Sequence, residues 1–349
     1  MVKNKFQIKN IFKHQIAIPL IALIILIIVN AVKNPAVLSI MLETNAKGYP
    51  ILNGQLIVLL SQGAELALLA IGMTLVTAAS GGQDISVGAG IAVAGSTILA
   101  FVRQPDNSIP LLVVVLIGIL AAMAIGLFNG FLVSYFKIQP MIATLIMFTA
   151  GRSIAAWINN NELPVIVDPE FGYWGNLIPG CPIPTPIIIT AVCLIITGLV
   201  LKFTNLKLYV QSVGINQAAA RLNGLNPTII KISTYVILGV FVGIAAFVNV
   251  SRSGTINYGN ICKDIEMDAI LAVAMGGNSL GGGKFSIWAS VIGAYVIQLL
   301  TQTLYLFGVD PMAMKAYKAI VVILLVVISA PKVKEAIGKV FKSKNKEVA

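Results

Sequence analysis

The 349-residue chain has very little charge for its length. Only 11% of its residues are Asp, Glu, Lys or Arg, whereas soluble domains carry about 25%. Hydrophobic residues make up 58%, and the mean hydropathy is +0.92. That apolar content would fill about ten membrane helices of about 20 residues each. We therefore expect an all-α, polytopic integral membrane protein without a large soluble domain.

Histidine and cysteine are scarce, which argues against several kinds of site. His14 is the single histidine, and Cys181, Cys193 and Cys262 have neither metal-ligand spacing nor that of a disulfide framework. No paired His, Cys or carboxylate constellation suggests an enzyme. We expect no catalytic residues, no metal site and no cofactor bound by this chain.

The net charge of +11 is concentrated at the chain ends. Four lysines precede the first apolar run, and six follow the last one. Such clusters indicate topology signals and contacts with anionic lipid, not nucleic acid. The first apolar run, residues 16–32, is long for a signal peptide and no A-x-A site follows. We predict one transmembrane domain over 1–349, with a basic tail at 1–14, spans within about 15–330 and a second tail at 331–349.

Ten apolar runs are predicted to be spans. They lie near residues 15–32, 51–79, 84–101, 109–136, 138–158, 184–203, 229–250, 265–281, 286–306 and 314–330. With both termini cytoplasmic, 16 Lys and Arg residues are assigned to the inside group and 8 to the outside group. Because cytoplasmic connections are enriched in these residues, this arrangement is favoured.

A carboxylate stands beside two glycines in the stretch "TAASGGQDISVGAG", residues 77–90. Gly81 and Gly82 free the backbone, and Asp84 can accept bonds from the first amides of the next helix, Ser86 included. A hairpin cap is favoured over a place on the transport path. Residues 81–87 also resemble residues 281–287 in glycine, serine and apolar positions, a weak internal repeat such as many transporters contain.

Three further carboxylates, Glu65, Glu266 and Asp268, lie within predicted spans. An ionised group at mid-bilayer costs about 2.5–3.5 kcal/mol on insertion scales, so each is expected to face a polar helix partner or water. They are candidates for the pore or for a polar core. For Glu65, function and structural packing stay equally open.

The stretch "GINQAAARLNGLNP", residues 214–227, favours a short helix between spans. Asn216 can cap its start, and Gly224 with Pro227 can end it. A helix with a small face suits a cleft on a partner protein. An amphipathic connector on the membrane surface is the alternative, and the residues alone do not decide between them.

The glycine-rich stretch "GGNSLGGGKFS", residues 276–286, is not a phosphate loop. The G-x-x-x-x-G-K-[ST] pattern needs Gly where Asn278 stands and Ser or Thr where Phe285 stands. We predict a tight turn, with Lys284 on the inside face. Any ATP hydrolysis must then come from other chains.

Three segments resemble the bacterial simple-sugar permeases of ATP-binding-cassette importers. "GMTLVTAASGGQDISVGAGIAVAG" resembles the family signature, with Gly81, Gly82, Asp84, Ser86 and Gly88 in the hairpin and Gln83 where the family usually has Ile. "NQAAARLNGLN" resembles its cytoplasmic coupling segment, and "EMDAILAVAMGGNSLGGGKFS" another family segment. The ribose, xylose, galactose and galactofuranose permeases share these motifs. The resemblance covers most of residues 55–330, and "GKFSIWASVIGAYVIQLLTQTLY" leans toward the galactofuranose permeases.

The resemblance implies a subunit in the bacterial cytoplasmic membrane that pairs with a second permease copy or a close paralogue. Two ATPase subunits, which bind ATP and Mg, and an extracytoplasmic sugar-binding protein would complete it. It also implies a coupling role for Gly214, Asn216, Ala219, Arg221 and Gly224. An ion-coupled secondary transporter and a branched-chain amino-acid permease are the alternatives.

Overall fold

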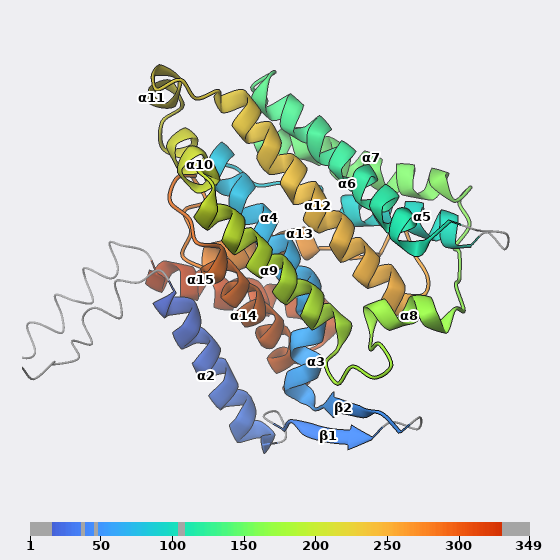
Figure 1. The fold of residues 1–349 in the computed structure, drawn as a ribbon. Helices are drawn as coiled ribbons and strands as arrows, with labels where there is room; N and C mark the ends of the chain where they lie inside the picture. Colours follow the sequence, from blue (N-terminus) through green and yellow to red (C-terminus); the bar gives the residue numbers. More distant parts are fainter. Residues whose placement is uncertain (1–15, 36–38, 45–47, 104–108, 330–349) are drawn as a thin grey trace, which may run out of the picture.

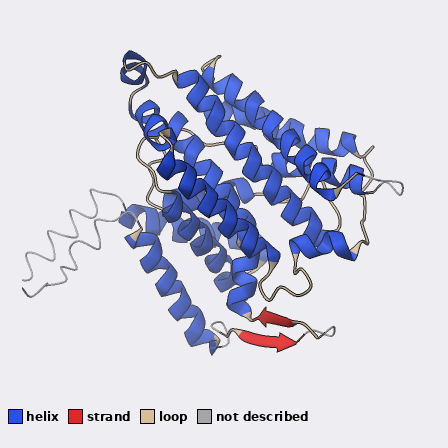
Figure 2. Cartoon of the chain, in the orientation of Figure 1, coloured by secondary structure: helices blue, strands red, loops and turns tan. Residues whose placement is uncertain are grey.

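The computed structural model describes residues 16–35, 39–44, 48–103 and 109–329 of the chain. The lysine clusters predicted at both ends fall outside these residues, as does the tail at 331–349. Within the described part the protein is a bundle of helices with one small β-hairpin (Figures 1 and 2). Five helices are long and apolar enough to cross a membrane, or six if one bent pair is counted as a span. The protein is therefore helical and crosses the membrane several times.

Each of the ten predicted spans contains a helix. The five long helices are α6 (Leu111–Ser134), α7 (Pro140–Ile158), α9 (Thr185–Phe203), α12 (Pro227–Ser253) and α14 (Ile287–Leu306). The remaining ones are α2 (Ala17–Lys33), the pair α3 (Gln55–Gln62) and α4 (Ala64–Ser80), α5 (Val87–Val102), α13 (Ile265–Met275) and α15 (Pro311–Ser329). Short helices α8 (Pro169–Gly175), α10 (Leu206–Ile215) and α11 (Gln217–Leu222) and strands β1 (Met41–Thr44) and β2 (Pro50–Asn53) connect them.

Two predicted spans are interrupted. The run at 51–79 begins in strand β2 and then bends by 40° at Gly63, between α3 and α4. The run at 265–281 is helical only over its 11-residue first part, α13, which rises about 16 Å. Hydropathy could not show either break, because apolar composition persists where the helical hydrogen bonds stop.

An irregular segment, residues 254–264, precedes α13 and packs along α5. A Cβ atom on Gly95 would lie 3.3 Å from Ile256, and one on Gly88 would lie 3.0 Å from the carbonyl oxygen of Cys262. Ile256, Tyr258 and Ile261 are buried. The segment is therefore anchored to the bundle by these three side chains, while Asn257, Gly259 and Asn260 between them are exposed.

The helix starts follow the weak repeat seen in the sequence. Helices α5 and α6 begin at 87 and 111, while α14 and α15 begin at 287 and 311. Helices α4 and α13 begin at 64 and 265, and each has a glutamate as its second residue. The two glycine-rich turns also touch, since the Gly283 amide donates to the Ala78 carbonyl over 2.9 Å. The two halves thus share a plan around a common centre.

The contact between α6 and α12 is built on small residues. Gly126 and Gly130 of α6 lie against Tyr235 and Ile232, and Gly239 and Gly243 of α12 lie against Met123 and Ile119. A Cβ on Gly126 would come within 2.3 Å of the Tyr235 carbonyl oxygen. Each helix therefore contributes a G-x-x-x-G motif, which lets the two backbones approach closely.

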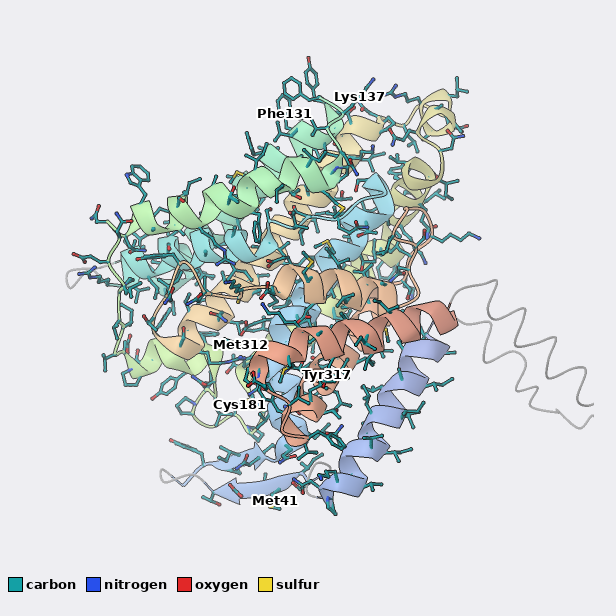
Figure 3. All side chains as sticks on the ribbon, turned by 180° about the vertical axis from the view of Figure 1, so that it is seen from behind. Met41, Phe131, Lys137, Cys181, Met312 and Tyr317 are labelled. Atoms are coloured by element: carbon teal, nitrogen blue, oxygen red, sulfur yellow. The ribbon has the colours of Figure 1, made fainter. Side chains whose placement is uncertain are left out.

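The bundle has two distinct ends (Figure 1). Helices α10 and α11 project from one, which we call the α11 end, and the β1–β2 hairpin and α8 lie at the other, the hairpin end. The start of α2 and the end of α15 lie close together, away from the hairpin end, as Figures 1 and 3 both show.

Candidate functional site

The segment predicted to couple to a partner forms a capped helix, as expected. The Asn216 side-chain oxygen accepts bonds from the amides of Ala218 and Ala219, at 3.0 and 3.1 Å. Helix α11 ends at Leu222, and Gly224 then adopts a left-handed backbone with φ of 78°. The N-cap and the glycine stop, both predicted from sequence, are confirmed.

Helix α11 presents a small and apolar surface at the end of the molecule. Ala218 and Ala219 are exposed, whereas Ala220 points inward and is 3% exposed. Leu222 is 90% exposed. A groove of about 480 Å³ runs between α10 and α11. An apolar surface of this kind at the tip of a helical hairpin is typical of a protein-binding site.

Gly214 at the end of α10 holds this segment against the bundle. A Cβ there would lie 1.8 Å from the Ala78 carbonyl oxygen and 2.7 Å from the Gly283 amide nitrogen. Only glycine permits this approach of three backbones. The end of α4, the turn at 281–283 and the start of the coupling segment therefore meet at one point.

The hairpin between α4 and α5 is ordered by Asp84. Its Oδ1 atom accepts bonds from the Ser86 amide at 2.8 Å and the Ser86 hydroxyl at 2.6 Å. Gly81, with φ of 66°, ends α4. A cap on the hairpin is thus present, although Asp84 reaches only the amide of Ser86, the N-cap residue of α5, and none of the amides within that helix.

Asn129 of α6 completes the polar cluster around Asp84, and the sequence reading missed it. Its amide nitrogen donates to the Ser86 hydroxyl at 2.8 Å and lies 3.3 Å from Asp84 Oδ2. Asn129 is fully buried and Asp84 is 3% exposed. A lone asparagine between two glycines in an apolar helix was the available signal.

Gly82 and Gly88, the other hairpin glycines, are sites of close packing. A Cβ on Gly82 would lie 2.5 Å from the ring of Pro140 in α7. One on Gly88 would lie 2.6 Å from Glu266 Oε2 and 3.3 Å from Arg152 Nη2. The hairpin is thereby fixed against both α7 and α13.

Glu65 forms a buried ion pair just after the bend at Gly63. Its carboxylate lies 3.0 Å from Arg252 Nη1 and accepts a bond of 2.8 Å from the Asn249 amide. A second guanidinium nitrogen of Arg252 donates to the carbonyl of Ser61, at 2.9 Å, where α3 ends. Arg252 thus neutralises Glu65 and satisfies the backbone that the bend leaves free.

Glu266 and Asp268 have different surroundings. Asp268 pairs with Lys318 of α15 at 2.8 Å. Glu266 is 1% exposed and has no ion pair among the described residues. Arg152, the nearby cation, donates instead to the carbonyls of Tyr258 and Ile261. Glu65 and Asp268 therefore pair with different cations, Glu266 has no ion pair in the described part of the chain, and the three carboxylates do not make a single site.

The turn at 276–286 is a structural element that joins two helices. Asn278 accepts a bond from the Ser286 amide and donates to the Ser290 hydroxyl, both at 2.7 Å. Thr74 of α4 donates to the same hydroxyl at 2.6 Å. Lys284 is exposed. The prediction of a tight turn is confirmed, and the phosphate-loop architecture of strand, loop and helix is not found here.

Comparison with known proteins agrees with these motifs. Residues 55–330 match the family described as "Branched-chain amino acid transport system / permease component". The chain is 36% identical over 325 residues to the galactofuranose transporter permease protein YtfT of Escherichia coli, covering 92% of each chain. It is 36% identical over 338 residues to the fructose import permease protein FruF of Bifidobacterium longum, covering 95% of this chain and 91% of the other.

A third relative, the ribose import permease protein RbsC of Escherichia coli, is 33% identical over 279 residues, which is 78% of this chain and 85% of that one. No solved structure matches the chain at a significant level. The matched range includes all three sequence motifs and the predicted spans between them. The chain therefore belongs to this family of importer permease components, and it is a membrane-spanning transport subunit rather than an enzyme.

Proposed function

We propose that the chain moves a simple sugar of the pentose, galactose or galactofuranose type across the bacterial cytoplasmic membrane. In this proposal an extracytoplasmic binding protein delivers the sugar at the hairpin end. Two ATPase subunits dock at the α11 end and hold ATP and Mg, and a second permease copy or a close paralogue completes the pathway. The names of the relatives, which transport galactofuranose, fructose and ribose, support the sugar class.

The observation that carries the proposal is the placement of α11. It is a capped helix with exposed small residues, and Gly214 ties it to the end of α4 and to the turn at 281–283. A push on α11 would reach both glycine-rich turns directly through backbone contacts. Two packings of such a bundle can be exchanged by rigid-body shifts of its helices.

The proposed topology has ten spans and cytoplasmic termini. The closeness of the two ends of the described chain and the distribution of Lys and Arg, 16 inside and 8 outside, support it. In this orientation the α11 end faces the cytoplasm. The β1–β2 hairpin, α8 and the loop at 159–168 face outward, where a binding protein would dock.

The ion-coupled alternative finds less support in the geometry. A proton carrier needs a carboxylate that can lose its partner during transport. Glu65 is held by Arg252 and Asn249, and Asp84 by Ser86 and Asn129. Both carboxylates are fixed parts of the packing. The branched-chain amino-acid alternative shares the family description, but the relatives named above are sugar permeases.

Substitutions in α11 test the proposal. Ala219→Trp places a ring where a tight contact is required, and overpacking typically costs about 1–3 kcal/mol. Arg221→Glu reverses a charge beside it. We expect both variants to insert normally, to lose most sugar uptake and to co-purify poorly with the ATPase subunits. Ala219→Ser, which keeps the surface small, is the matched control and should retain both properties.

Glu65→Gln separates the two mechanisms. Under the proposal it keeps the ATPase subunits bound, whatever its effect on transport. If Ala219→Trp and Arg221→Glu left uptake unchanged while Glu65→Gln abolished a proton-dependent uptake, the chain would be a secondary transporter. If the proposal holds, changes in the melting temperature of the purified binding protein with a panel of sugars would identify the substrate.

A further inference from the structure

A second polar cavity lies at the α11 end, beside the coupling helix. It has a volume of about 240 Å³ and lies where the turn between α6 and α7 meets α11 and the start of α12. Three cationic side chains line it, Lys137, Arg221 and Lys231, and none of its lining residues is acidic. The cavity therefore carries a concentrated positive charge.

Lys231 is the most unusual of these cations because it is 8% exposed. None of the ion pairs or side-chain hydrogen bonds found among the described residues involves its ammonium group. Ser134, which is 9% exposed and also lines the cavity, has a hydroxyl without a hydrogen-bond partner in the described part of the chain. Buried polar groups are normally paired, so these two point to a ligand that supplies an acceptor.

Two long helices begin at the cavity and add to its preference for an anion. Pro140, the first residue of α7, and Pro227 and Thr228, the first residues of α12, all line it. The start of a helix carries partial positive charge, which favours an anion. The contribution here is that of the helix dipoles, because Pro140 and Pro227 have no amide hydrogen and the Thr228 and Ile229 amides already donate to the Asn226 side chain. Three cations and two helix starts around one small cavity match the chemistry of a phosphate group.

The position of the cavity along α6 indicates where that phosphate comes from. α6 exposes large apolar side chains along most of its length. Phe131 near its end, and Tyr135 and Phe136 just beyond it, are 42%, 64% and 58% exposed. These three rings pack on one another with centroids 5.1 to 5.4 Å apart. Lys137 follows directly, and Figure 3 shows Phe131 and Lys137 together at this end. Tyr and Trp are enriched at the depth of lipid headgroups, so Tyr135 beside Lys137 indicates that the cavity opens near that depth.

We propose that this cavity binds the phosphate of an anionic phospholipid headgroup from the adjacent leaflet. The acyl chains would lie along the lipid-facing side of α6 and the phosphate would neutralise Lys231, Lys137 and Arg221. Basic pockets between membrane helices bind anionic headgroups in this manner. The proposal concerns the cavity itself and does not depend on the sugar or on which face of the membrane the α11 end occupies.

The test uses the purified, delipidated full chain and short-chain phosphatidylglycerol, with the melting temperature followed as lipid is added. We expect saturable stabilisation that weakens with salt, and an affinity at least tenfold lower for the zwitterionic phosphatidylcholine of the same chain length. Lys231→Gln and Lys137→Gln should each weaken phosphatidylglycerol binding about tenfold, the loss of one charge-assisted contact of about 1.4 kcal/mol. Lys231→Arg should restore binding.

Lys284→Gln is the matched control, because Lys284 is exposed at the same end but lies outside the cavity. It should bind as the unaltered chain does. Lys137 is exposed, so its variant remains informative even if Lys231→Gln folds poorly. Arg221 is left unchanged because it also belongs to the coupling helix.

Three results would overturn the proposal. If Lys231→Gln and Lys137→Gln both bound phosphatidylglycerol as tightly as the unsubstituted chain, the lipid would bind elsewhere. Inorganic phosphate that stabilises the chain at the same concentration as phosphatidylglycerol would make the ligand a free phosphate compound. Protection by the ATPase subunit alone, with no effect of the lipid, would mean that the cavity receives a carboxylate from that partner.

Discussion

The buried charges of this chain act mainly as structural elements. At the bend near Gly63, Arg252 donates a hydrogen bond to the Ser61 carbonyl and also forms an ion pair with Glu65. Asp84 does the equivalent for the turn before α5. In both places a carboxylate that suggests a functional site in the sequence stabilises an irregular stretch of backbone. The backbone groups of such a stretch must be paired within the protein, because the membrane interior has no water to bind them.

Removing the cation should reveal how strongly Glu65 depends on it. Arg252→Met leaves the carboxylate buried and its partner gone, and breaking a buried pair costs about 3–5 kcal/mol. We expect a clear fall in the melting temperature, partly recovered in the double variant with Glu65→Gln. Lys315→Met is the control, because the pair that Lys315 forms with Asp264 is exposed and should contribute about 0–1 kcal/mol. An unchanged melting temperature for Arg252→Met would show that the pair is not structural.

Two substitutions of Asp84 separate the contribution of its hydrogen bonds from that of its negative charge. Asp84→Asn keeps an oxygen that accepts from the Ser86 amide, so transport and melting temperature should change little. Asp84→Ala leaves the Ser86 amide and hydroxyl without their acceptor, at a cost of about 1–3 kcal/mol. Uptake and thermal melting of both variants are the measurements. Loss of uptake in Asp84→Asn at normal stability would give the charge itself a role in transport.

At the scale of elements, the α6–α12 pair depends on close backbone approach. Gly126→Leu would place a side chain where a Cβ alone lies 2.3 Å from the Tyr235 carbonyl oxygen. We expect loss of the folded chain or a shift of α6, seen as a drop in melting temperature and in monodisperse yield. Ala124→Leu, on an exposed position of the same helix, should be tolerated. Equal tolerance at both positions would contradict the packing described here.

Helix α11 was predicted well because its signals are local. A cap residue, a short run of helix formers and a glycine stop act through neighbouring backbone groups, so the sequence is enough to locate them. The bend at Gly63 within the predicted span 51–79, and the early end of α13 at Met275 within the predicted span 265–281, were not predicted. The carbonyl of Ser61 at the bend accepts a bond from Arg252, which lies 191 positions away in the sequence.

At the scale of the whole molecule, sidedness is the testable property. In variants without native cysteines, single cysteines at positions 207 and 346 should be shielded from an impermeant thiol reagent in intact cells. One at position 168, at the hairpin end, should react. All three should react once the membrane is permeabilised, which controls for buried sites. Reaction of the first two in intact cells would rule out cytoplasmic termini.

The amino-acid sequence was sufficient to predict the membrane class, the approximate places of the helices, the capped helix α11 and the family. These predictions rest on apolar runs, on residues that cap or end helices, and on three motifs in the expected order. Each of these signals involves residues that are close together in the sequence. The tertiary structure alone decided which charges meet. It paired Glu65 with Arg252, joined Asn129 to Asp84, and gathered Lys137, Arg221 and Lys231 around one cavity. Such contacts arise when distant helices pack, and their energies depend on burial and distance, which no local pattern specifies.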